Sequence, residues 1–314
     1  MKRTLFSKSF ALGVGLLALP AVATAEDVKP TDAPFLWKVA GDTPSYLYGT
    51  IHLPDDRVLA LPASVEKAMD QCDVLYTEIP FDAETTQKGM AAFMMPEGQT
   101  LTKVLPSAVK TRLDSFLAPR GMSSAMFDPV TPMAVSVQIA LLDYAAQMAT
   151  KLPLDAMLVD RAKSADKKTA ALETIDEQVA AFQSFTMDEG IRMLEMTLDM
   201  LAELEGKSAA GILVEAYLTG SEDELMKTMD EAMDPDDPVS KRFHSVLIDA
   251  RNVIMSDRID EILQKDPAQS HFFAVGTAHY FGETGILAQL QADGYEVTRV
   301  KSAADVPAAA AVAP

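Results

Sequence analysis

Two histidines of this chain end the same short sequence pattern, although they lie far apart in the sequence. Each follows a run of aromatic and aliphatic residues and then the residues Gly-Thr-x-His, which end at His52 and at His279. In mixed α/β folds, ligands bind at the carboxyl ends of strands, where loops leave the sheet but are held rigidly by it. Since both runs are predicted as strands, His52 and His279 are candidates for one shared site. A hydrogen-bonded structural role for each histidine is the alternative.

A carboxylate is expected at the same edge of the sheet. Glu78 ends the strand-like run at 73–78 and is followed by a proline that stops the strand. Histidine with carboxylate is a ligand set that suits Zn, Mn, Fe or Co. We therefore expect His52, Glu78 and His279 to bind one divalent metal ion. Such an ion lowers the pKa of a bound water and supplies a nucleophile near neutral pH.

Two further charged residues are candidates for the reaction itself. Glu173 is expected to end a short strand just before a helix whose start is marked by the capping box Thr174 to Glu177. The helix dipole favours anions there, so Glu173 should stay ionised and suits an orienting base better than a general acid. Arg251, near the middle of a predicted helix, is a candidate clamp for a carbonyl or an oxyanion.

The elements that position these residues follow from hydrophobic periodicity and turn residues. Residues 35–39 and 45–49 are predicted as a β-hairpin that leads to His52. The strand at 73–78 follows a helix at 65–72 and is expected parallel to, and beside, the second hairpin strand. The later elements are a mainly helical region at about 87–233, a helix at 240–263, a strand at 272–275, a helix at 286–292 and a last strand at 295–300. The expected fold class is α/β, with a mixed sheet flanked by helices and a large helical insertion.

The first 25 residues have the features of a secretory signal peptide. A basic start precedes an apolar run at 10–22 that is too short to span a membrane comfortably, and cleavage is expected near Ala25. We expect a single domain at 26–301, periplasmic or secreted, with no transmembrane segment in the mature chain. Residues 302–314, rich in Ala and Pro, are expected to form a disordered tail.

The charge and cysteine content exclude several classes of function. Without its signal peptide the chain has 24 Lys and Arg against 46 Asp and Glu, a formal charge of −22. Such a surface repels nucleic acid and anionic lipid. Cys72, the single cysteine, falls on the apolar side of a predicted helix and is expected in the core, with a catalytic thiol as the less favoured alternative.

Methionines are concentrated in the acidic helical region at 176–233. Met193, Met196 and Met200 fall on the wide apolar face of one predicted helix. We expect this face to fill the core, and a hydrophobic groove that holds an unfolded peptide is the alternative.

The sequence resembles the TraB/PrgY/GumN family, whose animal members include the Tiki metalloproteases. The chain lacks His-Glu-x-x-His, Gly-x-Ser-x-Gly and a phosphate-binding glycine loop, so the commonest alternatives are removed. The resemblance covers residues 35–300. It rests on Tyr48-Gly49-Thr50-Ile51-His52-Leu53-Pro54, on Glu78, on Leu172-Glu173-Thr174 with Gln178, on Arg251-Asn252, and on Val275-Gly276-Thr277-Ala278-His279-Tyr280-Phe281-Gly282 with Gly285 and Gly294-Tyr295.

The resemblance implies a mixed α/β core related to the erythromycin-esterase and ChaN-like folds, with a helical insertion. It implies a metal-dependent protease centre that falls here on His52, Glu78 and His279, and it adds Asn252 to the candidate catalytic residues. One departure is Leu152-Pro153-Leu154-Asp155, which lacks the glycine that usually precedes the family's aspartate. No role is therefore assigned to Asp155.

Three functions are compatible with these residues. The first is an exported metal-dependent peptidase or related hydrolase. The second is a non-catalytic binding protein for a peptide or a small hydrophobic ligand, in which the histidines are structural. The third, by analogy with ChaN-like folds, is haem or iron handling with Tyr48 or Tyr280 near the site.

Overall fold

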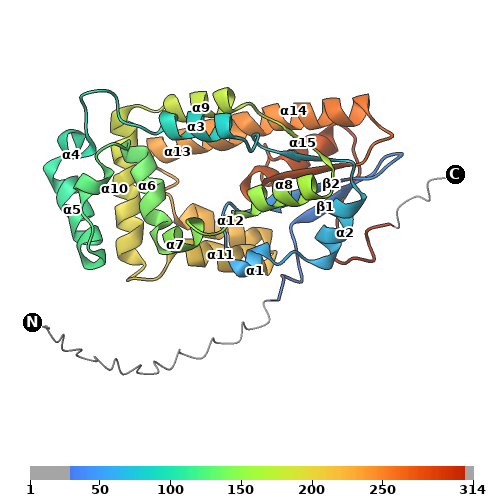
Figure 1. The fold of residues 1–314 in the computed structure, drawn as a ribbon, viewed down its shortest axis with the longest axis horizontal. Coiled ribbons are helices and arrows are strands. Elements are labelled where there is room, and N and C mark those ends of the chain that lie inside the picture. The colour runs from blue at the N-terminus through green and yellow to red at the C-terminus, as the bar shows by residue number, and fades with distance from the viewer. Residues whose placement is uncertain (1–28, 308–314) are drawn as a thin grey trace, which may run out of the picture.

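The computed structural model describes residues 29–307. The predicted signal peptide at 1–25, and residues 308–314 of the predicted tail, lie outside the described part of the chain. A six-stranded sheet is flanked by helices (Figure 1), which confirms the predicted α/β fold with a mixed sheet. The strand order is β4-β3-β5-β2-β1-β6, and the bounds are β1 Leu36–Val39, β2 Ser45–Thr50, β3 Val74–Thr77, β4 Lys168–Ala171, β5 His271–Gly276 and β6 Val297–Arg299.

The pairing of the strands corrects one prediction. β4, β3, β5 and β2 are parallel to their neighbours, whereas β1 pairs antiparallel with β2 and with β6, so the predicted hairpin is confirmed. The prediction that β3 lies beside β2 is wrong, because β5 lies between them and pairs with both. All six residues of β5 are buried. Such a strand is most stable in the centre of a sheet, where other strands cover both edges and helices cover both faces.

The helices divide the molecule into two halves (Figure 1). In the described residues they are α1 Asp56–Leu59, α2 Ala63–Gln71, α3 Ala83–Ala92, α4 Leu101–Val104, α5 Ser107–Leu117, α6 Pro132–Ala140, α7 Ala145–Met148, α8 Leu154–Ser164, α9 Ile175–Gln183, α10 Met187–Glu203, α11 Ala209–Thr219, α12 Glu222–Glu231, α13 Pro238–His244, α14 Ala250–Lys265 and α15 Ile286–Ala292. Figure 1 shows α4, α5, α6 and α10 at one end and the sheet with α2, α8, α14 and α15 at the other. Within the predicted helical region 87–233, β4 joins the sheet beside β3.

The helix predicted at 240–263 contains an irregular turn. α13 and α14 are joined by a π-helical turn at Ser245–Asp249, so the chain remains helical but its side chains change register there. π-turns inside helices occur frequently at functional sites. This one directly precedes Arg251 and Asn252, which are both buried.

The hydrophobic core is formed by one large cluster and two smaller ones. The large cluster packs the sheet against α2, α8, α11, α14 and α15. A second cluster joins α4, α5, α6 and α10, and a third contains Met133, Met193 and Leu247. Of the predicted tail, residues 302–307 are described: Val306 is 1% exposed, and the Lys67 ammonium donates to the Ala303 and Val306 carbonyls. None of the helices found between residues 29 and 307 has the length and apolar character needed to cross a membrane.

Candidate functional site

The carboxyl ends of three neighbouring parallel strands bring the two histidines to one carboxylate. β2 leads to His52, β3 leads to Glu78 and β5 leads to His279. His52 Nε2 lies 3.7 Å from Glu78 Oε1, and His279 Nε2 lies 3.9 Å from the same oxygen. Two side chains more than 200 residues apart in sequence therefore face one atom, because Thr50 pairs with Gly276 in the sheet register.

The glycines of the repeated pattern allow this approach. A Cβ atom on Gly276 would lie 2.9 Å from Glu78 Oε1 and 3.4 Å from His52 Nε2, so no side chain fits between these groups. The Gly276 amide donates to Glu78 Oε1 at 2.7 Å. A Cβ atom on Gly49 would lie 2.8 Å from Thr277 Oγ1, and Thr277 Oγ1 donates to the Thr50 carbonyl at 2.8 Å. The Gly-Thr pairs thus hold the two strand ends together.

His52 is held from behind by Asp155. Its Nδ1 lies 2.7 Å from Asp155 Oδ2, while the Thr50 hydroxyl donates to Asp155 Oδ1 at 2.6 Å. Because the carboxylate can only accept, His52 Nδ1 is the donor and Nε2 faces Glu78. Asp155 raises the pKa of His52 by its negative charge, and since 62% of the His52 side chain is exposed, water screens part of that effect.

His279 is held in the same way but is buried. Its Nδ1 lies 2.6 Å from Asn252 Oδ1, and its side chain is 6% exposed. Burial lowers the pKa of His279 to about 4, so the ring is neutral near pH 7. With Nδ1 donating to Asn252, Nε2 is unprotonated and can act only as an acceptor or a ligand. Within residues 29–307, Asn252 Nδ2 is buried without a hydrogen-bond partner.

Arg251 links the two candidate carboxylates. Its Nη2 donates to Glu78 Oε2 at 2.7 Å and to Glu173 Oε2 at 2.6 Å, and its Nε contacts both Glu173 oxygens at 3.0 and 3.1 Å. Its Nη1 donates to the Leu247 carbonyl in the π-turn and lies 3.3 Å from His279 Nε2. Every nitrogen of the guanidinium is therefore engaged within the protein.

Burial and neighbouring charge act differently on the two glutamates. Burial alone would raise the pKa of Glu78, but the positive charges that His279, His52 and Arg251 can carry outweigh it and hold the pKa below its usual range. Arg251 is charged at every relevant pH. For Glu173, burial raises the pKa and outweighs the guanidinium. Desolvation of Glu173 thus opposes the helix dipole, which was expected to favour the ionised form of this side chain.

All six candidate site residues predicted from the sequence lie in this cluster. Glu173 does not face the histidines, however, since both its oxygens are bound by Arg251 and its side chain is 1% exposed. Asp155 was not predicted, although it contacts His52 directly. Between residues 29 and 307, no three His, Cys, Asp or Glu side chains converge closely enough, as they stand, to hold a metal ion. Arg251 Nη1 lies beside the nitrogen of His279 that would bind one.

The tyrosines considered for haem binding are buried. Tyr280 is 0% exposed and donates to the Phe273 carbonyl at 3.0 Å, and Tyr48 is 2% exposed and accepts from Tyr217 at 3.3 Å. Neither hydroxyl is free to bind iron from solvent. Cys72 is buried near Ser270, before the start of β5, at the opposite end of the strands from the histidines, which agrees with its predicted place in the core.

Comparison with known proteins gives one family. A model of the TraB/PrgY/gumN family matches residues 35–299. The chain is 27% identical to metalloprotease TIKI1 of Danio rerio over 84% of its own length, 26% identical to metalloprotease TIKI1 of Homo sapiens over 88%, and 24% identical to the metalloprotease TIKI homolog of Nematostella vectensis over 87%. The aligned part covers 62%, 64% and 68% of those three proteins. No solved structure matched the chain significantly.

Proposed function

The chain belongs to the TraB/PrgY/gumN family, and from this membership and the geometry of the site we propose that it is an exported metal-dependent hydrolase that cleaves peptides. The relatives named metalloprotease support the reaction class. Since the chain spans about 62% of the first of them, their activity is carried over here as a proposal.

One observation carries the proposal. The Nε2 atoms of His52 and His279 face the same oxygen of Glu78, while each Nδ1 is held by its own acceptor, Asp155 or Asn252. Histidines that bind metals in proteins usually donate their second nitrogen to a carboxylate or a carbonyl oxygen, which fixes the tautomer and the ring orientation. Both histidines are oriented as ligands of that kind.

The donor set fits a divalent cation in kind and in charge. Two imidazole nitrogens and a carboxylate match the preferences of Zn, Mn, Co or Fe. With both histidines neutral, as metal binding requires, ionised Glu78, Glu173 and Asp155 carry three negative charges and Arg251 carries one positive charge, which leaves an excess of two negative charges. A divalent ion held by His52, Glu78 and His279 would neutralise that excess. The space above Gly276, which a Cβ would occupy, is bordered by all three of these side chains.

When bound, such an ion would lower the pKa of a water molecule and supply the nucleophile for peptide hydrolysis. The residues of the chain have separate tasks. Asp155 and Asn252 fix the ring orientations of His52 and His279. Arg251 orients Glu78, and because every nitrogen of its guanidinium is engaged within the protein, we assign it a positioning role rather than that of an oxyanion clamp. Glu173 holds Arg251, so we assign it a positioning role rather than that of a base.

Export is part of the proposal. Residues 1–25 have the pattern of a cleavable signal peptide, which would place the mature protein in the periplasm or outside the cell. N-terminal sequencing of the protein recovered from the periplasmic fraction tests this, with a start near Glu26 expected.

Metal analysis tests the site. Protein purified without chelator or a nickel column should contain about one divalent ion per chain, and His52→Ala and His279→Ala should each lose most of it. A peptide library should be cleaved by the wild type and not by either variant. His244→Ala, at an exposed histidine outside the site, is the control. Full metal content in His52→Ala and His279→Ala would exclude this metal centre.

A further inference from the structure

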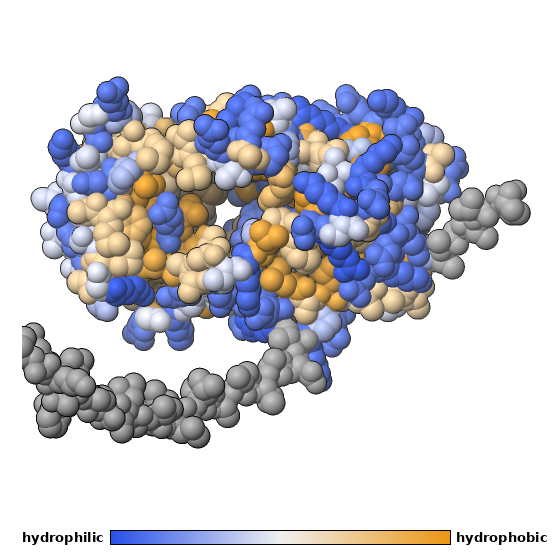
Figure 2. Space-filling view, viewed as in Figure 1, coloured by the Kyte–Doolittle hydropathy of each residue, from blue (hydrophilic) through white to orange (hydrophobic). Residues whose placement is uncertain are grey.

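A cavity of about 360 Å³ lies among α6, α10, α11, α12 and α13, and none of its lining residues belongs to the histidine cluster. Its walls are apolar and include five methionines, Met193, Met196, Met200, Met229 and Met233. Met193 is buried, as predicted for the methionine face, but the other four are only partly buried, and Val137 on α6 is 48% exposed. The space-filling view shows hydrophobic side chains on both sides of a hollow between the two halves of the molecule (Figure 2).

The cavity lies where two parts of the hydrophobic core fail to merge. Ala210, Leu213 and Met229 pack with the large cluster around the sheet, whereas Met196 and Phe243 pack with the small cluster of Met133, Met193 and Leu247. Protein interiors are normally close-packed, with few voids larger than a water molecule. An apolar space of this size has the dimensions of a ligand pocket.

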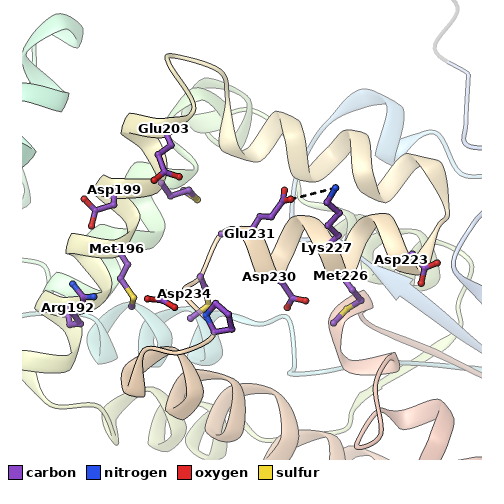
Figure 3. A pocket seen from close by; sticks show the side chains of 14 residues that line it. Arg192, Met196, Asp199, Glu203, Asp223, Met226, Lys227, Asp230, Glu231 and Asp234 are labelled. Atoms are coloured by element: carbon purple, nitrogen blue, oxygen red, sulfur yellow. Dashed lines mark ion pairs between the residues drawn. The ribbon is translucent and has the colours of Figure 1, made fainter.

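A second, acidic pocket of about 840 Å³ adjoins the cavity and shares Met196, Met200, Glu231, Ala232 and Met233 with it. Figure 3 shows its acidic side chains on α10, on α12 and at Asp234. The residues that line it include six with carboxylates and two that are basic. Both basic residues are already paired, Lys227 with Glu231 and Arg192 with Asp237. Among the described residues, four of its carboxylates have no basic partner within ion-pair distance: Glu203, Asp223, Asp230 and Asp234.

We propose that the cavity and this acidic pocket form one peptide-binding site, in which an apolar side chain enters the methionine-lined cavity and a neighbouring Lys or Arg pairs with the free carboxylates. Methionine side chains are flexible and adapt to different apolar groups, which suits binding to varied sequences. The negative field of the pocket favours a cationic segment and disfavours an anionic ligand such as a fatty acid. The inference rests on the proposed function only in taking a peptide as the substrate.

The position of the cavity relative to the histidine cluster is consistent with a substrate that contacts both. Met193 and Phe243 pack with Leu247, whose carbonyl accepts from Arg251. On the other side, α11 lines the cavity with Ala210 and Leu213, while its Tyr217 hydroxyl donates to the Gly49 carbonyl at 2.9 Å. The cavity would therefore hold a part of the peptide away from the bond that is cleaved and select substrates with an apolar residue beside a basic one.

Fluorescence anisotropy with a labelled peptide containing the sequence Leu-Leu-Lys-Arg tests the proposal on the full chain without added metal. The test variant is Glu203→Lys with Asp230→Lys. Both residues are exposed and lie in the last turn of a helix, where a basic residue is favourable, so the fold should be kept. The matched control is Glu97→Lys with Asp257→Lys, at exposed acidic residues outside the pocket, which changes the net charge by the same amount.

The wild type should bind the peptide, and Glu203→Lys/Asp230→Lys should weaken binding by about tenfold at low salt, whereas the control pair should stay within about twofold. Replacing Lys-Arg by Glu-Glu, or Leu-Leu by Ser-Ser, in the peptide should each weaken binding. No binding to the wild type, equal binding to the two charge variants, or tighter binding of a fatty acid than of the peptide would overturn the proposal.

The same assay separates this inference from the proposed function. His52→Ala/His279→Ala removes both candidate metal ligands but touches neither the cavity nor the acidic pocket, so binding of the basic peptide should be retained. If binding is lost in this variant and kept in Glu203→Lys/Asp230→Lys, the peptide binds at the histidine cluster and the second site is wrong. If binding follows the proposal but no metal is found, the proposed function fails alone.

Discussion

One oxygen of the Asp155 carboxylate lies 2.7 Å from His52 Nδ1, and the other accepts a hydrogen bond from the Thr50 hydroxyl. One side chain from the first turn of α8 thus fixes both the tautomer and the orientation of a histidine at the end of β2. Asp155 is 3% exposed, and His52 is its one ion-pair partner in the described part of the chain, so its charge is directed at His52.

Asp155→Asn should therefore weaken metal binding without unfolding the protein. The amide keeps the size of the carboxylate but loses the negative charge that raises the pKa of His52, and loss of such a second-sphere partner typically lowers metal affinity by about 10- to 100-fold. Competition with a chromophoric chelator measures the affinity. Asp160→Asn, at an exposed position of the same helix, is the control and should bind as the wild type does. An unchanged affinity in Asp155→Asn would mean that Asp155 does not support a ligand.

Gly276→Ala should remove the site while largely preserving the fold. The new Cβ would lie 2.9 Å from Glu78 Oε1 and 3.4 Å from His52 Nε2, so Glu78 must move away from both histidines. We expect loss of metal and of peptide cleavage, with a decrease of about 1–3 kcal/mol in the free energy of unfolding from overpacking. Gly89→Ala in α3 is the control, since its Cβ would meet no atom closer than 3.9 Å. Full activity in Gly276→Ala would show that this glycine does not shape the site.

Arg251 and Glu173 should behave as one unit in a double-mutant cycle. Arg251→Ala leaves two buried carboxylates without their cation and should lower the free energy of unfolding by about 3–5 kcal/mol. In Arg251→Ala/Glu173→Gln one of those charges is absent, so the loss should be smaller than the sum of the two single effects. Urea unfolding measures all four proteins. Arg161→Ala, which breaks a more exposed pair with Glu66, should cost about 0–1 kcal/mol. Additive effects would mean that the pair is not coupled.

The repeated Gly-Thr-x-His pattern was sufficient to predict that His52 and His279 lie together. A strand before His52 and another before His279 place both at one sheet edge in any parallel arrangement, and the structure has that edge. The strand order was not predictable in the same way, because no local sequence feature of β5 indicates that it lies between β2 and β3. Its apolar run from Phe272 to Val275, typical of a central strand, was the available signal.

Asp155 shows what sequence spacing cannot provide. It lies more than 100 residues from His52, in a helix whose start has no marker other than a proline, and an aspartate in a first helical turn is ordinary in any protein. Glu173 shows the reverse case, because its position before a capping box was correctly predicted. Its contact with the Arg251 guanidinium, however, depends on the packing of α14 against the sheet. Long-range partners of this kind become visible only in the folded chain.

The buried, neutral state of His279 should make the metal-free protein less stable in mild acid. Burial lowers the pKa of His279 to about 4, whereas an unfolded histidine titrates near 6.5, so between these values the unfolded chain binds a proton that the folded chain does not. Stability should therefore fall as the pH is lowered from about 6.5 to 4, by about 3 kcal/mol from this residue. His279→Gln, which cannot titrate, should show a flatter dependence in urea unfolding at pH 4.5 and 7. His244→Gln, at an exposed histidine, should follow the wild type. If His279→Gln and the wild type lose equal stability on acidification, His279 is protonated in the folded state.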